Sequence, residues 1–200
     1  MRTTLANVWH PIGGIAISEL GKGRYLFRLY HVVDVNRIDK EGPWYFNTHL
    51  LVLHMLQEKE DLMLVSLNIV DFWVRIVDLP EGFVSERMAK LFGNFISEFL
   101  EYDASDVSLG YKGCIHSRVR IDVRQPLKRN KKLALPNRNH VYAAFQYEKL
   151  RLFCFICEKS GHGEGFCPIR ILYEKQDFVF QWDNSLHAPP RQRGQLYSPG

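Results

Sequence analysis

The stretch Cys154-Phe-Ile-Cys157-Glu-Lys-Ser-Gly-His162-Gly-Glu-Gly-Phe-Cys167 places four potential metal ligands in the order C-x2-C-x4-H-x4-C. Three thiolates and one imidazole are the donor set of a closed, tetrahedral structural zinc site. Two cysteines separated by two residues can point into one tight turn, and the four-residue gaps allow the chain to close around an ion. Because so short a loop cannot bury a core of its own, we expect one Zn2+ to supply most of its folding free energy.

Three other interpretations of this stretch remain open. A disulfide is one, but three of the four cysteines lie in this cluster and the N-terminus has no apolar signal-peptide segment, which favours a reducing compartment. A loop that has lost its metal is the second. The third is a catalytic zinc site, because His162-Gly-Glu164 matches the H-x-E of zinc deaminases, but no P-C-x-x-C follows downstream. With all four positions taken by side chains, we expect the zinc to be structural.

This pattern resembles the CCHC zinc knuckle of retroviral nucleocapsid proteins and of many cellular and retroelement proteins that bind single-stranded nucleic acid. The resemblance implies that the aromatic residue after the first cysteine, here Phe155, stacks on an unpaired base. Phe166, just before Cys167, is a second candidate for stacking or for packing, and Lys159 is a candidate contact to nucleic acid. The chain departs from the family at Glu158, where knuckles commonly have glycine.

The composition is that of a globular protein. Apolar residues make up 46% of the 200 residues, which is enough to fill a sizeable core. The sequence has no run of eighteen apolar residues, so we expect no transmembrane helix and no membrane partner. Together with the missing signal segment, this predicts an intracellular protein, in the nucleus or the cytoplasm.

Charge is unevenly distributed along the chain. Residues 57–111 hold eleven acidic and four basic residues, whereas residues 112–151 hold eleven Lys or Arg against Asp122 and Glu148. A basic block that runs into the zinc loop is typical of a nucleic-acid binder; an ordinary solvated surface is the alternative. The candidate phosphate contacts are three arginines on one face of a predicted strand and four residues of a predicted loop, namely Arg118, Arg120, Arg124, Lys128, Arg129, Lys131 and Lys132.

Hydrophobic periodicity and turn residues predict a mixture of strands and helices. Strands are expected at residues 15–17, 24–30, 44–46, 49–56, 70–77, 117–124 and 141–147. Helices are expected over the first nine residues, from an N-cap at Asp34 to about Gly42, and after an N-cap at Ser85. In the last of these, Met88, Phe92, Phe95 or Ile96, and Phe99 form one apolar stripe that we assign to the core.

These elements predict an α+β fold: a mostly antiparallel sheet with helices packed on one face, followed by the small CCHC zinc knuckle and a disordered tail. The expected domains are an α+β domain over residues 1–148, the knuckle over residues 149–170, and a mostly disordered tail over residues 171–200. Because a helix opens the chain with no strand before it, we expect the α+β domain to lack its first strand.

The order of several landmarks extends the resemblance to most of the chain. They are Gly42-Pro-Trp-Tyr-Phe46, Phe72-Trp-Val-Arg-Ile76, Leu79-Pro80, Arg120-Ile-Asp-Val123, Pro126-Leu127 and Tyr147-Glu-Lys-Leu150 before the knuckle. In this order they resemble a plant family that pairs an uncharacterised α+β domain with a CCHC knuckle. Many of its members resemble the gag-like part of plant LINE-type retrotransposons.

Together these features predict a zinc-dependent protein that binds single-stranded RNA or DNA with low sequence specificity. The alternative is a protein-interaction module that self-associates or docks a partner such as another retroelement protein, with the zinc loop as a structural clip. No P-loop and no G-x-S-x-G nucleophile elbow is present, so we expect no enzymatic activity and no small-molecule substrate.

Overall fold

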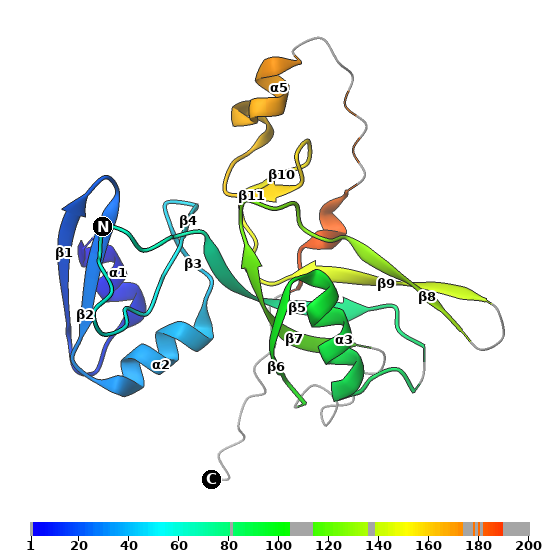
Figure 1. Ribbon diagram of the computed structural model, residues 1–200, viewed down its shortest axis with the longest axis horizontal. Helices are drawn as coiled ribbons and strands as arrows, with labels where there is room; N and C mark the ends of the chain where they lie inside the picture. The colour runs from blue at the N-terminus through cyan, green and yellow to red at the C-terminus, as the bar shows by residue number, and fades with distance from the viewer. Residues whose placement is uncertain are drawn as a thin grey trace, which may run out of the picture. The chain divides into compact units, whose positions relative to one another are not determined.

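The computed structural model describes residues 2–80, 82–104, 114–135, 139–173, 178, 180 and 182–189. The chain divides into two compact units, Met1–Leu51 and Val52–Gly200 (Figure 1). The zinc loop, residues 154–167, thus falls in the second unit. The predicted boundaries at residues 148 and 170 stay predictions.

The first unit is built from short elements around a small aromatic core. Its core residues include Leu5, Trp9 and Ile38, and the Trp9 ring lies edge-on to Phe27, with centroids 5.1 Å apart. Two antiparallel pairs, β1–β2 and β3–β4, make separate two-stranded sheets. The elements are α1 (Arg2–Trp9), β1 (Ile15–Gly21), β2 (Arg24–Leu29), α2 (Val32–Glu41), β3 (Trp44–Phe46) and β4 (His49–Leu51). The predicted strand at residues 49–56 is therefore shorter than expected.

Asp34 has a different role from the one the sequence predicts. His31 is the N-cap of α2, and its Nδ1 accepts the N–H of Val33. Asp34 lies in the first turn, fully buried, and its two carboxylate oxygens accept the N–H groups of Ile12 and Gly13, each at 3.0 Å. Those two backbone N–H groups hold the pKa of the Asp34 carboxyl below its ordinary value. Asp34 therefore ties the turn before β1 to α2.

A five-stranded antiparallel sheet forms the centre of the second unit, with α3 (Glu86–Ile96) across one face (Figure 1). The strand order is β6-β7-β5-β9-β8. The strands are β5 (Ile69–Val77), β6 (Glu98–Tyr102), β7 (Ile115–Asp122), β8 (Asn130–Ala134) and β9 (His140–Tyr147). Alternate residues of β5 and β9 are buried, as period-two sequences require, and Phe92 of α3 packs edge-on against Phe145 of β9. The predicted α+β class with a mostly antiparallel sheet is confirmed.

Helix α3 begins as the sequence predicts and ends earlier. Ser85 is its N-cap, with Oγ accepting the N–H of Met88 at 3.4 Å, and Phe92 and Ile96 are buried. Phe99, predicted as the end of the helical stripe, lies on β6 instead. A Cβ at Gly93 would come within 2.8 Å of Cδ2 of Phe99, so glycine permits the tight return from helix to strand.

After β9 the chain forms the small elements around the zinc ligands and then a structured return segment. The elements around the ligands are β10 (Phe153–Cys154), β11 (Lys159–Ser160), η1 (Glu164–Phe166) and α5 (Pro168–Leu172). The return segment contains η2 (Asn184–Leu186). Within the segment predicted to be a mostly disordered tail, the structure describes residues 182–189, where Trp182 and Leu186 are buried. Residues 190–200 lie outside the described residues. Among the helices that the structure describes, none is long and apolar enough to span a membrane.

Candidate metal centre and nucleic-acid interface

Cys154, Cys157, His162 and Cys167 converge on one point. One potential ligand atom from each lies within 4.8 Å of the others, and Sγ of Cys157 is 3.2 Å from Nε2 of His162. Ligand sulfurs around a tetrahedral zinc, with Zn–S bonds of about 2.3 Å, lie roughly 3.8 Å apart, so this arrangement fits one ion. The four residues form a single zinc site of the C-x2-C-x4-H-x4-C type.

A short hairpin builds the first half of this site. Strands β10 and β11 pair antiparallel, with Cys154 opposite Lys159, and the Glu158 N–H donates to the Cys154 carbonyl at 2.8 Å. Two residues of this hairpin are left-handed: Glu158, the last residue of the turn, has φ of 60°, and Gly161, directly after β11, has φ of 104°. Glu158, which replaces the usual knuckle glycine, therefore adopts the backbone conformation that favours glycine.

Backbone amides surround the thiol groups. Burial raises the pKa of Cys154 to about 12, although the N–H groups of Cys157 and Ile156 lower it. For Cys167, burial also raises the pKa, but the N–H of Arg170 and the His162 side chain outweigh it and lower the pKa to about 7. Such N–H groups stabilise thiolates, and a bound zinc ion would supply the larger part of the charge needed to keep all three deprotonated.

Glu164 supports the loop as a hydrogen-bond acceptor. Its Oε1 accepts the N–H of Phe155 at 3.2 Å, which connects the η1 turn to the first turn of the zinc loop. In the sequence, Glu164 stands out only as part of an H-x-E motif. A carboxylate that accepts a hydrogen bond from a backbone N–H nine residues earlier has no sequence signature, so this role of Glu164 could not be predicted.

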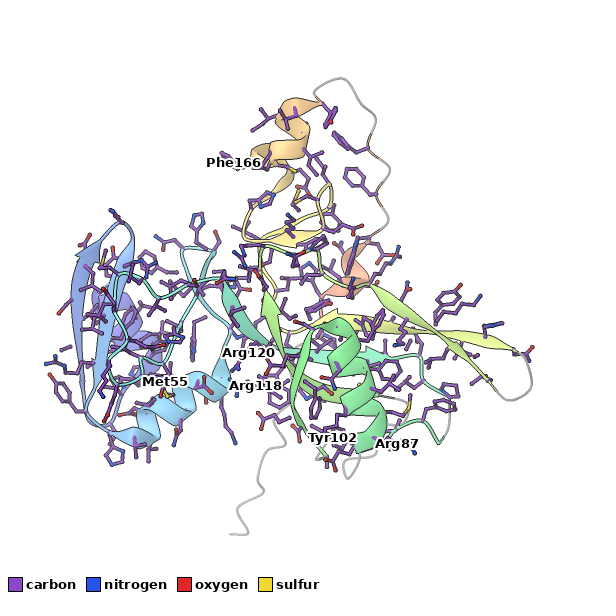
Figure 2. The ribbon with its side chains drawn as sticks, viewed as in Figure 1. Met55, Arg87, Tyr102, Arg118, Arg120 and Phe166 are labelled. Carbon is purple, nitrogen blue, oxygen red and sulfur yellow. The ribbon has the colours of Figure 1, made fainter. Side chains whose placement is uncertain are left out.

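The two phenylalanines of the loop differ in accessibility. Phe155 is half-buried, edge-on to Phe153 at a centroid distance of 5.1 Å, and its ring is 6.4 Å from that of Phe180. Phe166 is 82% exposed and lies on the outside of the zinc loop (Figure 2). Lys159 is half-buried on β11. Phe166 is therefore the more accessible ring for stacking.

The three predicted arginines lie in ion pairs. Arg118 and Arg120 lie on β7 (Figure 2), and both contact the carboxylate of Asp71 on β5, at 3.2 and 3.0 Å. Arg118 is also 3.6 Å from a Glu101 oxygen, and Arg124 Nε donates to Asp122 at 2.9 Å. That hydrogen bond holds the pKa of Asp122 well below its usual range. The predicted phosphate-binding face thus carries its own counter-charges, and its contact with nucleic acid stays a prediction.

The four other predicted basic residues lie in and just before β8, so the predicted loop is partly a strand. Lys128 and Lys132 have exposed side chains. The ammonium of Lys131 lies 4.0 Å from the centre of the Phe95 ring, a cation–π contact, and Arg129 is 3.7 Å from Asp183. Two further members of the basic block, Lys112 and Arg138, lie outside the described residues.

The segment between β7 and β8 contacts the zinc loop. The N–H of Leu127 donates to the Glu158 carbonyl at 2.8 Å, and Leu127 itself is buried. The Tyr147 hydroxyl donates to the carbonyl of Lys128 at 2.7 Å, which fixes the same segment from β9. The basic residues around Lys128 and the zinc loop therefore belong to one connected region.

Two family models match this chain. Residues 121–169 match the model described as a zinc knuckle, and residues 1–64 match the one described as a domain of unknown function, DUF4283. An uncharacterized protein of Arabidopsis thaliana is 23% identical over 138 residues, which is 69% of this chain and 43% of that protein. The chain thus spans less than half the length of this curated relative. No solved structure matches it.

The zinc-knuckle match starts at Ile121, on β7, well before the first ligand. It therefore includes β8, β9 and the Leu127 segment that contacts the zinc loop. The chain contains a CCHC zinc knuckle, and a domain similar to DUF4283 precedes it.

Proposed function

We propose that this chain binds single-stranded RNA or DNA with low sequence specificity, using the zinc knuckle as a rigid stacking platform. The observation that carries the proposal is Phe166, an 82% exposed ring one residue before the ligand Cys167. An aromatic ring fixed in this way can stack on any base, because every base has a π-face. Tight zinc coordination at Cys167 restricts the motion of the neighbouring backbone.

Positive charge next to the knuckle supports the same proposal. Lys128 and Lys132 have exposed side chains in and just before β8, next to Leu127, which contacts the knuckle. Lysines in such positions hold the phosphate backbone by charge and counterion release, without reading sequence. The ion-paired arginines of β7 contribute less in this scheme, because a phosphate must compete with Asp71 for them.

The decisive experiment is fluorescence-anisotropy titration of a labelled single-stranded oligonucleotide with the zinc-loaded chain and with the chelated chain. We expect binding that requires zinc and weakens steeply between low and physiological salt. Absence of binding at low salt, with one zinc ion bound per chain, would rule the proposal out.

The proposal includes the absence of enzymatic activity. Four protein ligands fill a tetrahedral zinc, which leaves no position for a reactive water. Glu164, the one carboxylate in an H-x-E arrangement, accepts the Phe155 amide instead. An intracellular location belongs to the same proposal.

We also propose that the chain is of the gag-like type found in LINE-type retrotransposons. The support is the order of its parts, an α+β region followed by a CCHC knuckle, and its match to a plant protein. Co-purification of element RNA with the chain from plant cells, absent after chelation, is the expected result.

A protein-docking module is the second candidate. It is favoured by the exposed apolar side chains of Ile171, Leu172 and Tyr173 after the last zinc ligand, and by the half-buried position of Phe155. In that case the zinc-loaded chain would show concentration-dependent self-association or partner binding, and no affinity for oligonucleotides.

A further inference from the structure

The knuckle lies between two chain segments that meet again at the sheet. The chain leaves β9 at Tyr147 and returns beside it at His187, where the two residues form a parallel bridge. The N–H of Ala188 donates to the Tyr147 carbonyl at 3.1 Å, and Nδ1 of His187 lies 3.1 Å from the Leu150 carbonyl. Because a carbonyl can only accept, His187 donates there through Nδ1–H. The chain segments before and after the knuckle are thus hydrogen-bonded to each other.

The returning segment also packs on the base of the knuckle. The Trp182 ring lies against Phe153, with centroids 5.1 Å apart, and both side chains are buried. Leu186, on η2, is 1% exposed. Phe153 directly precedes the first zinc ligand, so Trp182 contacts the residue that joins the sheet to the metal site. A buried tryptophan contributes a large apolar area at such a contact.

The segment between β7 and β8 contacts both the knuckle and the returning segment. Leu127 donates its N–H to Glu158 in the knuckle turn, and Arg129 lies 3.7 Å from Asp183 in the returning segment. Segment 182–188 and the residues before β8 therefore both contact the base of the knuckle, and they also contact each other.

We propose that residues 182–188 are a latch that fixes the knuckle against the five-stranded sheet, with Trp182 and His187 as its positioning residues. Fixed in this way, Phe166 and the basic residues around Lys128 form one composite surface for a single strand. This inference rests on the proposed function, since the composite surface matters only if nucleic acid binds.

The physical consequence is that a strand bound at one of the two sites meets the other site at a high effective concentration. A knuckle on a free linker would sample many orientations, so that stacking on Phe166 and phosphate contact at Lys128 would combine weakly. Fixing their separation removes this entropic cost, and a strand long enough to reach both gains affinity without any new contact. A strand too short to span them gains nothing.

The first test measures the latch without nucleic acid. In the zinc-loaded chain, 15N relaxation should give backbone amides of the knuckle and of the sheet one common rotational correlation time. Trp182→Ala should shorten the correlation time of the knuckle alone, and Tyr173→Ala, which alters an aromatic ring 52% exposed after α5, should leave it unchanged. A knuckle that already tumbles independently in the unmodified chain overturns the inference.

The second test separates positioning from simple structural support. Affinities are compared for oligothymidines of about four and about twenty nucleotides, which lie at and beyond the limits of about 4–16 nucleotides covered by single-strand sites on OB folds. Trp182→Ala should weaken binding of the long strand about tenfold and leave the short strand and the zinc content unchanged. Equal loss for both lengths, or no loss for either, overturns the proposed role.

A milder variant guards against misfolding of Trp182→Ala. His187→Ala removes the hydrogen bond to the Leu150 carbonyl and leaves the buried Trp182 in place, and it should reduce long-strand binding by a smaller factor in the same direction. If the unmodified chain binds neither strand, the proposed function fails, whereas the relaxation measurement still decides whether the latch exists.

Discussion

Asp71 and Arg120 lie directly opposite each other on β5 and β7, and the carboxylate accepts hydrogen bonds from Nε at 3.0 Å and Nη2 at 3.3 Å. The same carboxylate accepts a bond from Arg118, so one carboxylate bridges two arginines of one strand face. Cross-strand pairs of opposite charge stabilise a sheet. The charged side chains on this face of the sheet therefore form an ion-pair network.

Asp71→Asn should destabilise the chain and make both guanidinium groups more available. Because Arg118 is only 8% exposed, losing the closer of its two charged partners should lower the free energy of unfolding by about 1–3 kcal/mol, measured by urea denaturation. The same variant should bind single-stranded oligonucleotides more tightly, with a steeper salt dependence.

The matched control for Asp71 is Glu98→Gln. Glu98 is 4.0 Å from Arg120 and 61% exposed on its side chain, so its removal should cost less than about 0.5 kcal/mol. Equal destabilisation by the two variants would show that Asp71 has no special place in the network.

Cys157→Ala should abolish the single zinc site and unfold the knuckle. Three remaining ligands leave the loop without the metal that organises it. We expect the metal content to fall from one zinc ion per chain to none by atomic emission spectrometry, and the sheet to stay folded by circular dichroism. Cys114→Ala is the control, because Cys114 is buried outside the metal cluster. Retention of zinc by Cys157→Ala would contradict the four-ligand site.

Glu158→Gly should be neutral or stabilising. Residue 158 has φ of 60°, a conformation that costs a non-glycine residue roughly 1–2 kcal/mol, partly offset by the greater freedom of glycine in the unfolded chain. We expect the thermal midpoint of the zinc-loaded chain to rise or stay level, while Glu158→Val lowers it. A clear loss on Glu158→Gly would mean that the glutamate side chain makes a contact that outweighs the backbone strain.

Asp34→Asn should weaken the first unit at neutral pH and not in acid. The pKa of Asp34 is depressed in the folded chain by the N–H groups of Gly13 and Ile12, so its contribution is complete above the unfolded pKa. That contribution is lost as the pH falls through the lower folded pKa. An amide can accept through one atom only, so one N–H loses its acceptor.

Thermal melts of the Asp34→Asn variant and the unmodified chain should therefore differ at pH 7 and converge as the pH falls through the acid range. Glu19→Gln, at an exposed position on β1, is the control and should change little at any pH. A difference between Asp34→Asn and the unmodified chain that stays constant with pH would contradict the role of the charged carboxylate.

Features that depend on neighbours in sequence could be predicted. The four zinc ligands lie within one short stretch, and the alternation of Val119 and Ile121 with arginines predicts β7 without knowledge of its partners. Ser85 as an N-cap is likewise a local property, since Oγ bonds an amide three residues ahead.

Features that depend on distant neighbours could not be predicted. Asp34 has the residue type of an N-cap, but the N–H groups that donate hydrogen bonds to its carboxylate lie 21 and 22 residues earlier. The acceptor of Arg118 and Arg120 lies 47 and 49 residues before them, on another strand. Trp182 lies in a segment without periodicity, and only the fold brings it to Phe153.

Phe166→Ala and Phe155→Ala should separate binding from folding. Removing the exposed Phe166 ring should weaken oligonucleotide binding by about 1–3 kcal/mol, roughly fivefold to 150-fold, with zinc content and thermal midpoint unchanged. Removing Phe155 takes away a ring that packs edge-on against Phe153, so it should lower the thermal midpoint of the knuckle as well. Anisotropy titrations and melts of both variants test this division. If only Phe155→Ala reduces affinity at unchanged stability, the stacking ring is Phe155, the position that the resemblance to zinc knuckles implies, and Phe166 serves another contact.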